Sequence, residues 1–178
     1  MGLSNYSVEQ VARYFEICNR EGFVRPSVYQ GHYNALIRRH EETLMPLLRK
    51  HGVAYYAFRP LSGGILTGKV TFATETLTRT RFAGESTQQY FLNTFDKPEI
   101  HDKLRTLSET CQQFGVSLSE VCLRWLVYHS ALGGDDAITL GAKRLDQLEA
   151  NVGDCRKGPL SQDLLKAVES MSSGGLVL

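Results

Sequence analysis

A glycine-rich stretch, Gly63 to Lys69, is the part of the sequence best suited to chemistry at a phosphate. It follows an apolar segment and fits the spacing G-x-x-x-x-G-K, but Val70 stands where a magnesium-binding P-loop needs Ser or Thr. Residues 71–80 also lack the helical period that a P-loop requires after its lysine. The stretch therefore disfavours a P-loop, although bare backbone N–H groups of glycines can still approach a diphosphate closely.

Two adjacent cations, Lys143 and Arg144, follow a short apolar segment and precede a predicted helix. Cations at the start of a helix oppose its dipole unless an anion is bound there. We interpret the pair as a site for an anionic group such as a ribose phosphate. A solvated pair of surface charges is the alternative.

Polar or functional residues follow each predicted strand. They are Ser4 and Asn5, then Gln30, then Phe58 with Arg59, and finally the segment 141–144. In parallel α/β architectures, ligands bind at the carboxyl ends of the strands. Four such clusters favour a ligand site at this end, although turns after strands are often polar in any protein.

Strand-like and helix-like segments alternate along the chain. Capping boxes at Ser7/Gln10 and Ser117/Glu120 predict two helix starts. Pro46 is compatible with a helix only in its first turn. The first predicted strand ends near Ser4–Asn5, and the others lie at 27–30, 53–58 and 137–140. The predicted helices lie at 8–21, 41–51, 100–114, 118–128, 145–152 and 160–171. Residues 59–97 show no strong period and predict a long loop. Such alternation is typical of parallel strands joined by crossover helices, with no domain boundary.

The composition is that of a globular protein. Of 178 residues, 42% are hydrophobic and 22% are charged, and the formal net charge is +1. The longest apolar run, Val53 to Phe58, is far shorter than the roughly 18 residues of a membrane span. We expect no membrane and no nucleic-acid partner. The four cysteines form no C-x-x-C pair, so they predict core thiols and no metal site, and the absence of a visible signal peptide predicts a cytoplasmic protein.

Several of these segments, taken in order, resemble the aldo-keto reductases, and most closely the aflatoxin-aldehyde reductase type and its fungal relatives. The matching segments are Gly2-Leu3-Ser4-Asn5-Tyr6, Val28-Tyr29-Gln30 with Tyr33-Asn34, Pro60 to Lys69, and Gly141 with Gln147-Leu148-Glu149 and Asn151. The resemblance implies an eightfold β/α barrel (a TIM barrel) that transfers hydride from NADPH to an aldehyde or ketone.

The resemblance also implies contacts with the coenzyme NADPH. Ser4, Asn5 and Gln30 would hold the nicotinamide carboxamide, and Phe58 would stack on the nicotinamide ring. Lys143 and Arg144 would meet the 2′-phosphate. The remaining implied contacts are Arg59, Leu61, Gly63, Gly64, Gly68 and Lys69 at the diphosphate, Arg81 at a phosphate, and Gly141, Gln147 and Asn151 around the adenine end. Arg59 stands where the family usually has Ser or Asn.

The family's catalytic Asp, Tyr, Lys and His lie on its first four strands, and this chain resembles only the half that follows them. We therefore expect α/β architecture as the C-terminal half of a TIM barrel, with about four parallel strands and flanking helices. Residues 1–178 would form a single partial barrel domain with no catalytic residue. Its two unpaired sheet edges predict possible self-association.

Two functions follow from these expectations. The first is an NADPH-dependent aldo-keto reductase, truncated and lacking the catalytic tetrad, with a small-molecule carbonyl substrate and a tailoring role in fungal secondary metabolism. The alternative is a non-catalytic NADPH-binding remnant or a regulatory interaction module.

Overall fold

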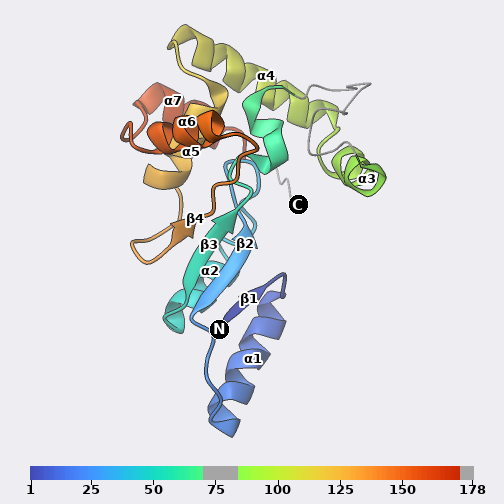
Figure 1. Ribbon diagram of the computed structural model, residues 1–178, viewed down its shortest axis with the longest axis vertical. Coiled ribbons are helices and arrows are strands. Elements are labelled where there is room, and N and C mark those ends of the chain that lie inside the picture. Colours follow the sequence, from blue (N-terminus) through green and yellow to red (C-terminus); the bar gives the residue numbers. More distant parts are fainter. Residues whose placement is uncertain (70–83, 173–178) are drawn as a thin grey trace.

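The computed structural model describes residues 1–69 and 84–172 (Figure 1). Its elements are β1 (Gly2–Ser4), α1 (Val8–Glu21), β2 (Val28–His32), α2 (Leu44–Lys50), β3 (Ala54–Phe58), the 3-10 helix η1 (Ser62–Thr67), α3 (Glu85–Thr94), α4 (Pro98–Gln113), α5 (Leu118–Tyr128), β4 (Ala137–Ile138), α6 (Leu145–Cys155) and α7 (Gln162–Glu169).

The described strands form one parallel sheet whose spatial order, β1-β2-β3-β4, is the order along the chain. A doubly wound sheet reverses its strand order at a switch point, whereas a β/α barrel adds each strand beside the last. The fold is therefore α/β with four parallel strands and flanking helices, as predicted, and is consistent with part of an eightfold barrel. β1 and β4 each have one neighbour, so each leaves an open edge.

The two faces of the sheet differ in burial. Tyr29 and Tyr55 point toward the helices and are fully buried. Gly31 is two residues after Tyr29 in β2. A Cβ added at Gly31 would lie 2.0 Å from the Tyr55 hydroxyl, so only glycine fits there. The opposite face is open or half-buried and carries Val28, Gln30, His32, Ala54, Tyr56 and Phe58.

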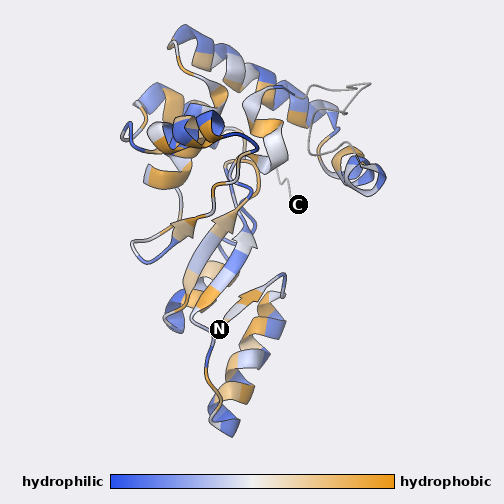
Figure 2. Ribbon diagram, viewed as in Figure 1, coloured by the Kyte–Doolittle hydropathy of each residue, from blue (hydrophilic) through white to orange (hydrophobic). Residues whose placement is uncertain are grey.

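The strands point toward one end of the molecule. Figure 1 shows α1 beside β1 at the other end, while η1, α4, α5, α6 and α7 gather beyond the strand tips. Hydrophobic and hydrophilic residues alternate along α1 and α4, as expected of helices with one buried face (Figure 2). Trp125 of α5 is fully buried among them and stacks under the Arg38 guanidinium.

Local signals explain several helix boundaries. Ser7 and Gln10 form the predicted capping box of α1, which ends at Gly22. The Ser117 hydroxyl accepts the Glu120 N–H, but the Glu120 carboxylate bonds to other residues, so only half of the second box forms. Pro46 occupies the first turn of α2, as its missing N–H requires.

Two expectations were wrong. The stretch 59–97 is not all loop, because it contains η1 and α3. β2 runs two residues past Gln30 and ends at His32. Helix α6 forms where it was predicted, although it buries none of its residues fully and Leu145 is 69% exposed. Cys18, Cys111 and Cys122 are buried free thiols, as predicted.

Candidate functional site

Parallel register brings the predicted strand-end residues to one edge of the sheet. Ser4 and Gln30 are paired across β1 and β2, and His32 and Phe58 are paired across β2 and β3. The half-buried Ser4 and exposed Gln30 share the open face. Ser4 and Gln30, which the resemblance assigned to the nicotinamide, are therefore neighbours, and Phe58 lies two residues beyond the position in β3 that pairs with Gln30.

Strained backbone follows two of these strands. Asn5, directly after β1, has a φ of 61°, and Arg59, directly after β3, has a φ of 54°. Side chains with a Cβ rarely adopt this left-handed conformation, and such strain concentrates at functional sites. Both residues are exposed and were predicted site residues.

Asn34 holds the loop after β2 against Arg59. Its fully buried side chain donates from Nδ2 to the Arg59 carbonyl at 2.9 Å, and its Oδ1 accepts the N–H groups of Leu36 and Ile37 at 3.0 Å. The amide thus fixes the backbone at the end of β3. Sequence reasoning noted Asn34 in a motif but gave it no role.

Aromatic rings surround the Arg59 guanidinium. Its central carbon lies 5.8 Å from the Phe58 ring centre and 5.3 Å from that of Tyr90 on α3. The His32 imidazole stacks on Phe58 with centroids 5.3 Å apart and planes 25° from parallel. Arg59, Phe58 and His32 therefore form one layered group at the tips of β2 and β3.

A cavity of about 380 Å³ opens beside this group. Its described wall comes from β2, the end of β3, η1 and α3, with one residue following α3. The lining residues are His32, Arg59, Ser62, Gly63, Thr87, Tyr90 and Phe95. Arg59 and Gly63 were predicted site residues, and Ser62 lies within the Pro60 to Lys69 segment of the resemblance. His32, Thr87, Tyr90 and Phe95 were missed because the extension of β2 and the existence of α3 were not foreseen.

The glycine-rich stretch forms the floor of this region as η1. Three consecutive residues, Ser62, Gly63 and Gly64, have φ values of 50°, 70° and 114°. Ile65 and Leu66 are fully buried and anchor the turn in the core, while Gly68 and Lys69 are exposed. The residues after Lys69 that would carry a P-loop helix, 70–83, lie outside the described residues, and the left-handed backbone at Gly63 and Gly64 suits a turn that approaches a ligand closely.

Two polar atoms in the cavity wall have no hydrogen-bond partner. They are Nε2 of His32 and Oγ of Ser62, both fully shielded from solvent, and Ser62 as a whole is 1% exposed. Burial, together with the charges of Arg59, Arg39 and His40, lowers the pKa of His32 to about 4, so the imidazole is neutral near pH 7. A bound group with oxygen acceptors would satisfy both atoms, so this wall fits a phosphate-bearing coenzyme.

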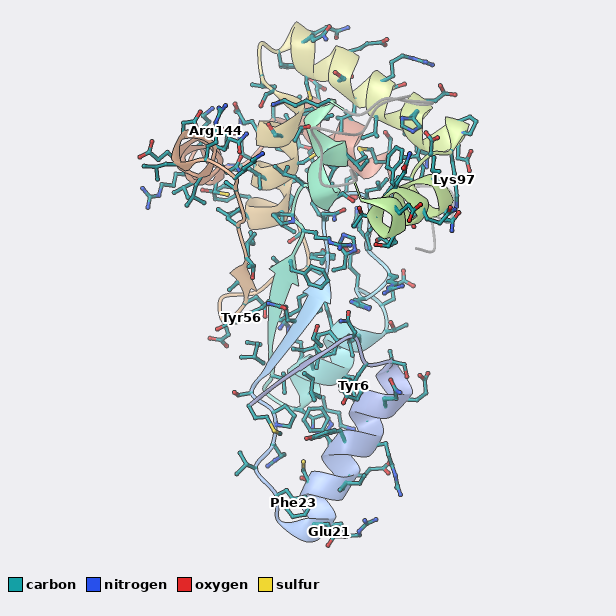
Figure 3. The ribbon with its side chains drawn as sticks, turned by 45° about the vertical axis from the view of Figure 1, so that its right-hand side comes forward. Tyr6, Glu21, Phe23, Tyr56, Lys97 and Arg144 are labelled. Carbon is teal, nitrogen blue, oxygen red and sulfur yellow. The ribbon has the colours of Figure 1, made fainter. Side chains whose placement is uncertain are left out.

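The second predicted cation cluster lies at the start of α6. Lys143 is exposed, and Arg144 pairs with the carboxylate of Asp146, which lowers the pKa of that carboxyl. Gln147 and Asn151 are half-buried one helical turn apart on α6. Figure 3 shows Arg144 and Lys97 on opposite sides of the group of helices beyond the strand tips.

The remaining predicted site residues are less informative. Leu61 is partly buried and packs against the hydrophobic core, and Gly141 is exposed. Arg81 lies outside the described residues. Across residues 1–69 and 84–172, no three His, Cys, Asp or Glu side chains gather to hold a metal ion, and no helix has the length and apolar character to span a membrane.

Comparison with known proteins agrees with this geometry. A family model described as the aldo/keto reductase family matches residues 1–173. An aldo-keto reductase of Pseudocercospora fijiensis is 36% identical over 171 residues, covering 94% of this chain and 58% of that protein. Aflatoxin B1 aldehyde reductase member 2 of Rattus norvegicus is 37% identical over 175 residues, covering 94% and 48%. Oxidoreductase sirO of Leptosphaeria maculans is 32% identical over 176 residues, covering 96% and 52%.

The chain spans about half the length of the curated relatives that it matches. Within that half, the family model covers nearly every residue, and the parallel sheet gathers the strand ends as a β/α barrel requires. The chain therefore belongs to the aldo/keto reductase family.

Proposed function

We propose that these residues form the coenzyme-binding half of an NADPH-dependent aldo-keto reductase that converts a small-molecule aldehyde or ketone to an alcohol. The observation that carries the proposal is the parallel register, which pairs Ser4 with Gln30 and places the strained Arg59 directly after β3, where its carbonyl accepts the Ser62 N–H of the glycine turn η1. When bound, the coenzyme supplies hydride. The residues of this chain hold and orient it.

Each strand end has a distinct binding role in this proposal. The polar groups of Ser4, Asn5 and Gln30 hold the carboxamide, and the half-buried Phe58 ring supports the nicotinamide from the open sheet face. Residues 61–69 offer backbone N–H groups to the diphosphate, with Arg59 and Lys69 supplying positive charge. Support for these roles comes from their shared edge of the sheet.

Preference for NADPH over NADH rests on Lys143 and Arg144 meeting the 2′-phosphate. Arg144 and Asp146 are both about two-thirds exposed, so their ion pair is screened by water and contributes little to stability. Arg144 can therefore exchange this partner for a phosphate. Gly141, Gln147 and Asn151 receive the adenine end, and Arg81 reaches a phosphate.

The acid that protonates the carbonyl oxygen is, in this proposal, supplied by β/α units outside these 178 residues. Tyr33, the phenol next to β2, does not substitute for it. Its hydroxyl donates to Glu41 at 2.6 Å and accepts the Ala131 N–H at 2.9 Å, and burial raises its pKa. Because the Tyr33 hydroxyl is held in the core, it cannot donate a proton to a bound carbonyl. That observation favours the second candidate function, a non-catalytic NADPH-binding or regulatory module.

Further parts of the proposal concern the whole chain. Residues 1–178 form a single partial barrel domain of a cytoplasmic protein with no nucleic-acid or membrane partner. A tailoring step in fungal secondary metabolism is the proposed setting, and the two fungal relatives support it.

Calorimetry and an aldehyde assay test the two candidate functions together. The full chain is titrated with NADPH and NADH, and NADPH oxidation is then followed with aldehydes. Binding that is at least about tenfold tighter for NADPH supports the coenzyme site, since one extra charge-assisted contact is worth about that factor. NADPH oxidation by this chain alone overturns the non-catalytic module, and no heat with either coenzyme overturns both candidates.

A further inference from the structure

The turn between β1 and α1 contains a strained residue of the candidate site. Asn5 has a φ of 61° and lies between Ser4, the last residue of β1, and Ser7, the N-cap of α1. Pairing of β1 with β2 fixes the chain before Asn5. A residue in this left-handed conformation persists only where the surrounding structure holds it, so the chain after Asn5 must be fixed as well.

The peptide group that joins Tyr6 to Ser7 is held at both of its polar atoms. The hydroxyl of Tyr29, a residue of β2, donates to the Tyr6 carbonyl at 2.8 Å, across 23 residues of sequence. The Ser7 N–H donates to the Gln10 side chain at 2.8 Å. Tyr6 itself lies between β1 and the first turn of α1 (Figure 3). The backbone on both sides of Asn5 is therefore fixed.

Tyr29 is a rigid support for this turn. Its side chain is buried on the helix side of the sheet, with the residue 1% exposed. Its ring centre lies 5.8 Å from that of Tyr55 and 6.1 Å from that of His40, with the His40 ring at right angles. Close packing of aromatic rings leaves the Tyr29 hydroxyl little freedom to follow a movement of the turn.

The same arrangement occurs on the other side of β2. Asn34, just after β2, donates from its buried side chain to the carbonyl of Arg59, whose φ is 54°. Both strained residues that directly follow strands are thus held by a buried polar side chain of the β2 segment, acting across a neighbouring strand. This repeat at two predicted site residues indicates that the bonds set the geometry of the site.

We propose that Tyr29 is a positioning residue of the coenzyme site. Its hydroxyl, through the Tyr6 carbonyl, holds the backbone of Asn5 so that the Asn5 side chain meets the nicotinamide carboxamide. The identity of the ligand rests on the proposed function. Tyr29 does not touch the coenzyme, because its side chain lies on the face of the sheet opposite to the open one.

Two matched variants of the full chain test this role. Tyr29→Phe removes the hydroxyl and keeps the ring. The control is Tyr55→Phe, which removes an equally buried hydroxyl from the next strand, whose partner is Nδ1 of His40 at 2.8 Å and not a turn at a strand end. The probes are NADP⁺ and adenosine 2′,5′-bisphosphate, which lacks the nicotinamide, each titrated by calorimetry.

We expect Tyr29→Phe to weaken NADP⁺ about three- to tenfold, the worth of one hydrogen bond, and to change the affinity for the bisphosphate less than about twofold. Tyr55→Phe should change both affinities less than about twofold. Asn5→Ala should also weaken NADP⁺, and the double variant should lose no more than Asn5→Ala alone, because Tyr29 acts through Asn5. Unchanged NADP⁺ affinity of Tyr29→Phe, equal weakening of both probes, or additive losses in the double variant overturns the positioning role.

A measurement without coenzyme separates this inference from the proposed function. The Cα and Cβ chemical shifts of Asn5 report its left-handed backbone. Tyr29→Phe should move them toward the values of an extended chain, whereas Tyr55→Phe should leave them in place. If the shifts move but the wild-type chain binds neither probe, the proposed coenzyme function fails and Tyr29 still sets the conformation of Asn5. If the shifts stay in place, the positioning role is overturned even when NADP⁺ binds well.

Discussion

At the scale of single residues, Asn34 is the side chain on which the wall of the cavity most depends. Replacing it with Ala removes three hydrogen bonds. The Arg59 carbonyl keeps the Ser62 N–H and the Ile37 N–H keeps the Asn34 backbone carbonyl, so the Leu36 N–H is the group that loses its partner. We expect Asn34→Ala to lower the free energy of unfolding by about 1 to 3 kcal/mol, the cost of one buried unpaired group.

Urea denaturation measures this loss. Asn93→Ala is the control, since Asn93 lies on the exposed side of α3 and accepts only the Gln89 amide. It should change the free energy of unfolding by less than about 0.5 kcal/mol. Equal urea midpoints for the two variants would show that the hydrogen bonds of the Asn34 side chain do not stabilise the loop after β2.

Two histidines make the fold sensitive to acid. Burial lowers the pKa of His32 and of His40 from 6.5 to about 4 in the folded chain. The unfolded chain takes up these protons near pH 6.5, so acid favours unfolding, and stability present above pH 6.5 is lost as the pH falls toward 4. Each histidine should account for roughly 2 to 3 kcal/mol of that loss.

Denaturation at neutral pH and near pH 4 tests this dependence in the wild-type chain and in His32→Leu. Carboxylates titrate equally in both proteins, so the difference between the two pH slopes reports His32 alone. The variant should lose less stability on acidification than the wild type. Identical slopes would mean that His32 is not held neutral by its surroundings.

At the scale of elements, Arg38 ties the loop after β2 to the C-terminal helices. Its guanidinium pairs with Glu41 and with Glu169 of α7, and it lies 4.7 Å from the ring centre of Trp125. Trp125 in turn donates from Nε1 to Glu169 at 2.7 Å. A single carboxylate therefore joins α5, α7 and the β2 loop.

Glu169→Ala should destabilise the fold through this junction. Arg38 keeps its pair with Glu41, but the buried Trp125 indole N–H loses its acceptor. We expect a loss of about 1 to 2 kcal/mol in the free energy of unfolding, discounted because Glu169 is 40% exposed. The control is Glu16→Ala, which breaks an Arg13 pair whose two side chains are more than 60% exposed. Thermal unfolding should separate the two variants, and similar melting temperatures would contradict the junction.

Apolar periodicity and capping residues decide which elements could be predicted from the sequence. The strands and the helices α1, α4, α5 and α7 carry clear apolar periods and capping signals, so their existence was readable from sequence. Helix α3 was missed because only Phe91 of its ten residues is buried, which leaves no period. Helix α6 was predicted from its apolar positions, which are at most half-buried where the helix packs against α5.

Residue-level prediction failed for a different reason. Ser4, Gln30 and Phe58 were predicted from strand ends visible in the sequence; Ser4 and Phe58 do end β1 and β3, whereas β2 continues past Gln30 to His32. His32, Tyr90 and the role of Asn34 depend on contacts between segments far apart in the chain, such as the Asn34–Arg59 bond and the Arg59–Tyr90 contact. Local pattern carries no information on such contacts.

At the scale of the whole molecule, the sheet has an open face and two open edges. Tyr56 lies 37% exposed on that face, near Val28, Ala54 and Phe58, and β1 and β4 each have one neighbour. Open edges and uncovered apolar surface favour association with another chain. We therefore expect the 178-residue chain to self-associate in a concentration-dependent way.

Sedimentation velocity over a wide concentration range measures this association. Tyr56→Lys places a charge on the open face and should shift the chain toward monomer, because a desolvated lysine opposes docking. Tyr128→Lys is the matched control, since Tyr128 is similarly exposed at 42% but ends helix α5. If both variants associate like the wild type, the open face is not the contact surface. If the wild type is monomeric at every concentration, the prediction of self-association is wrong.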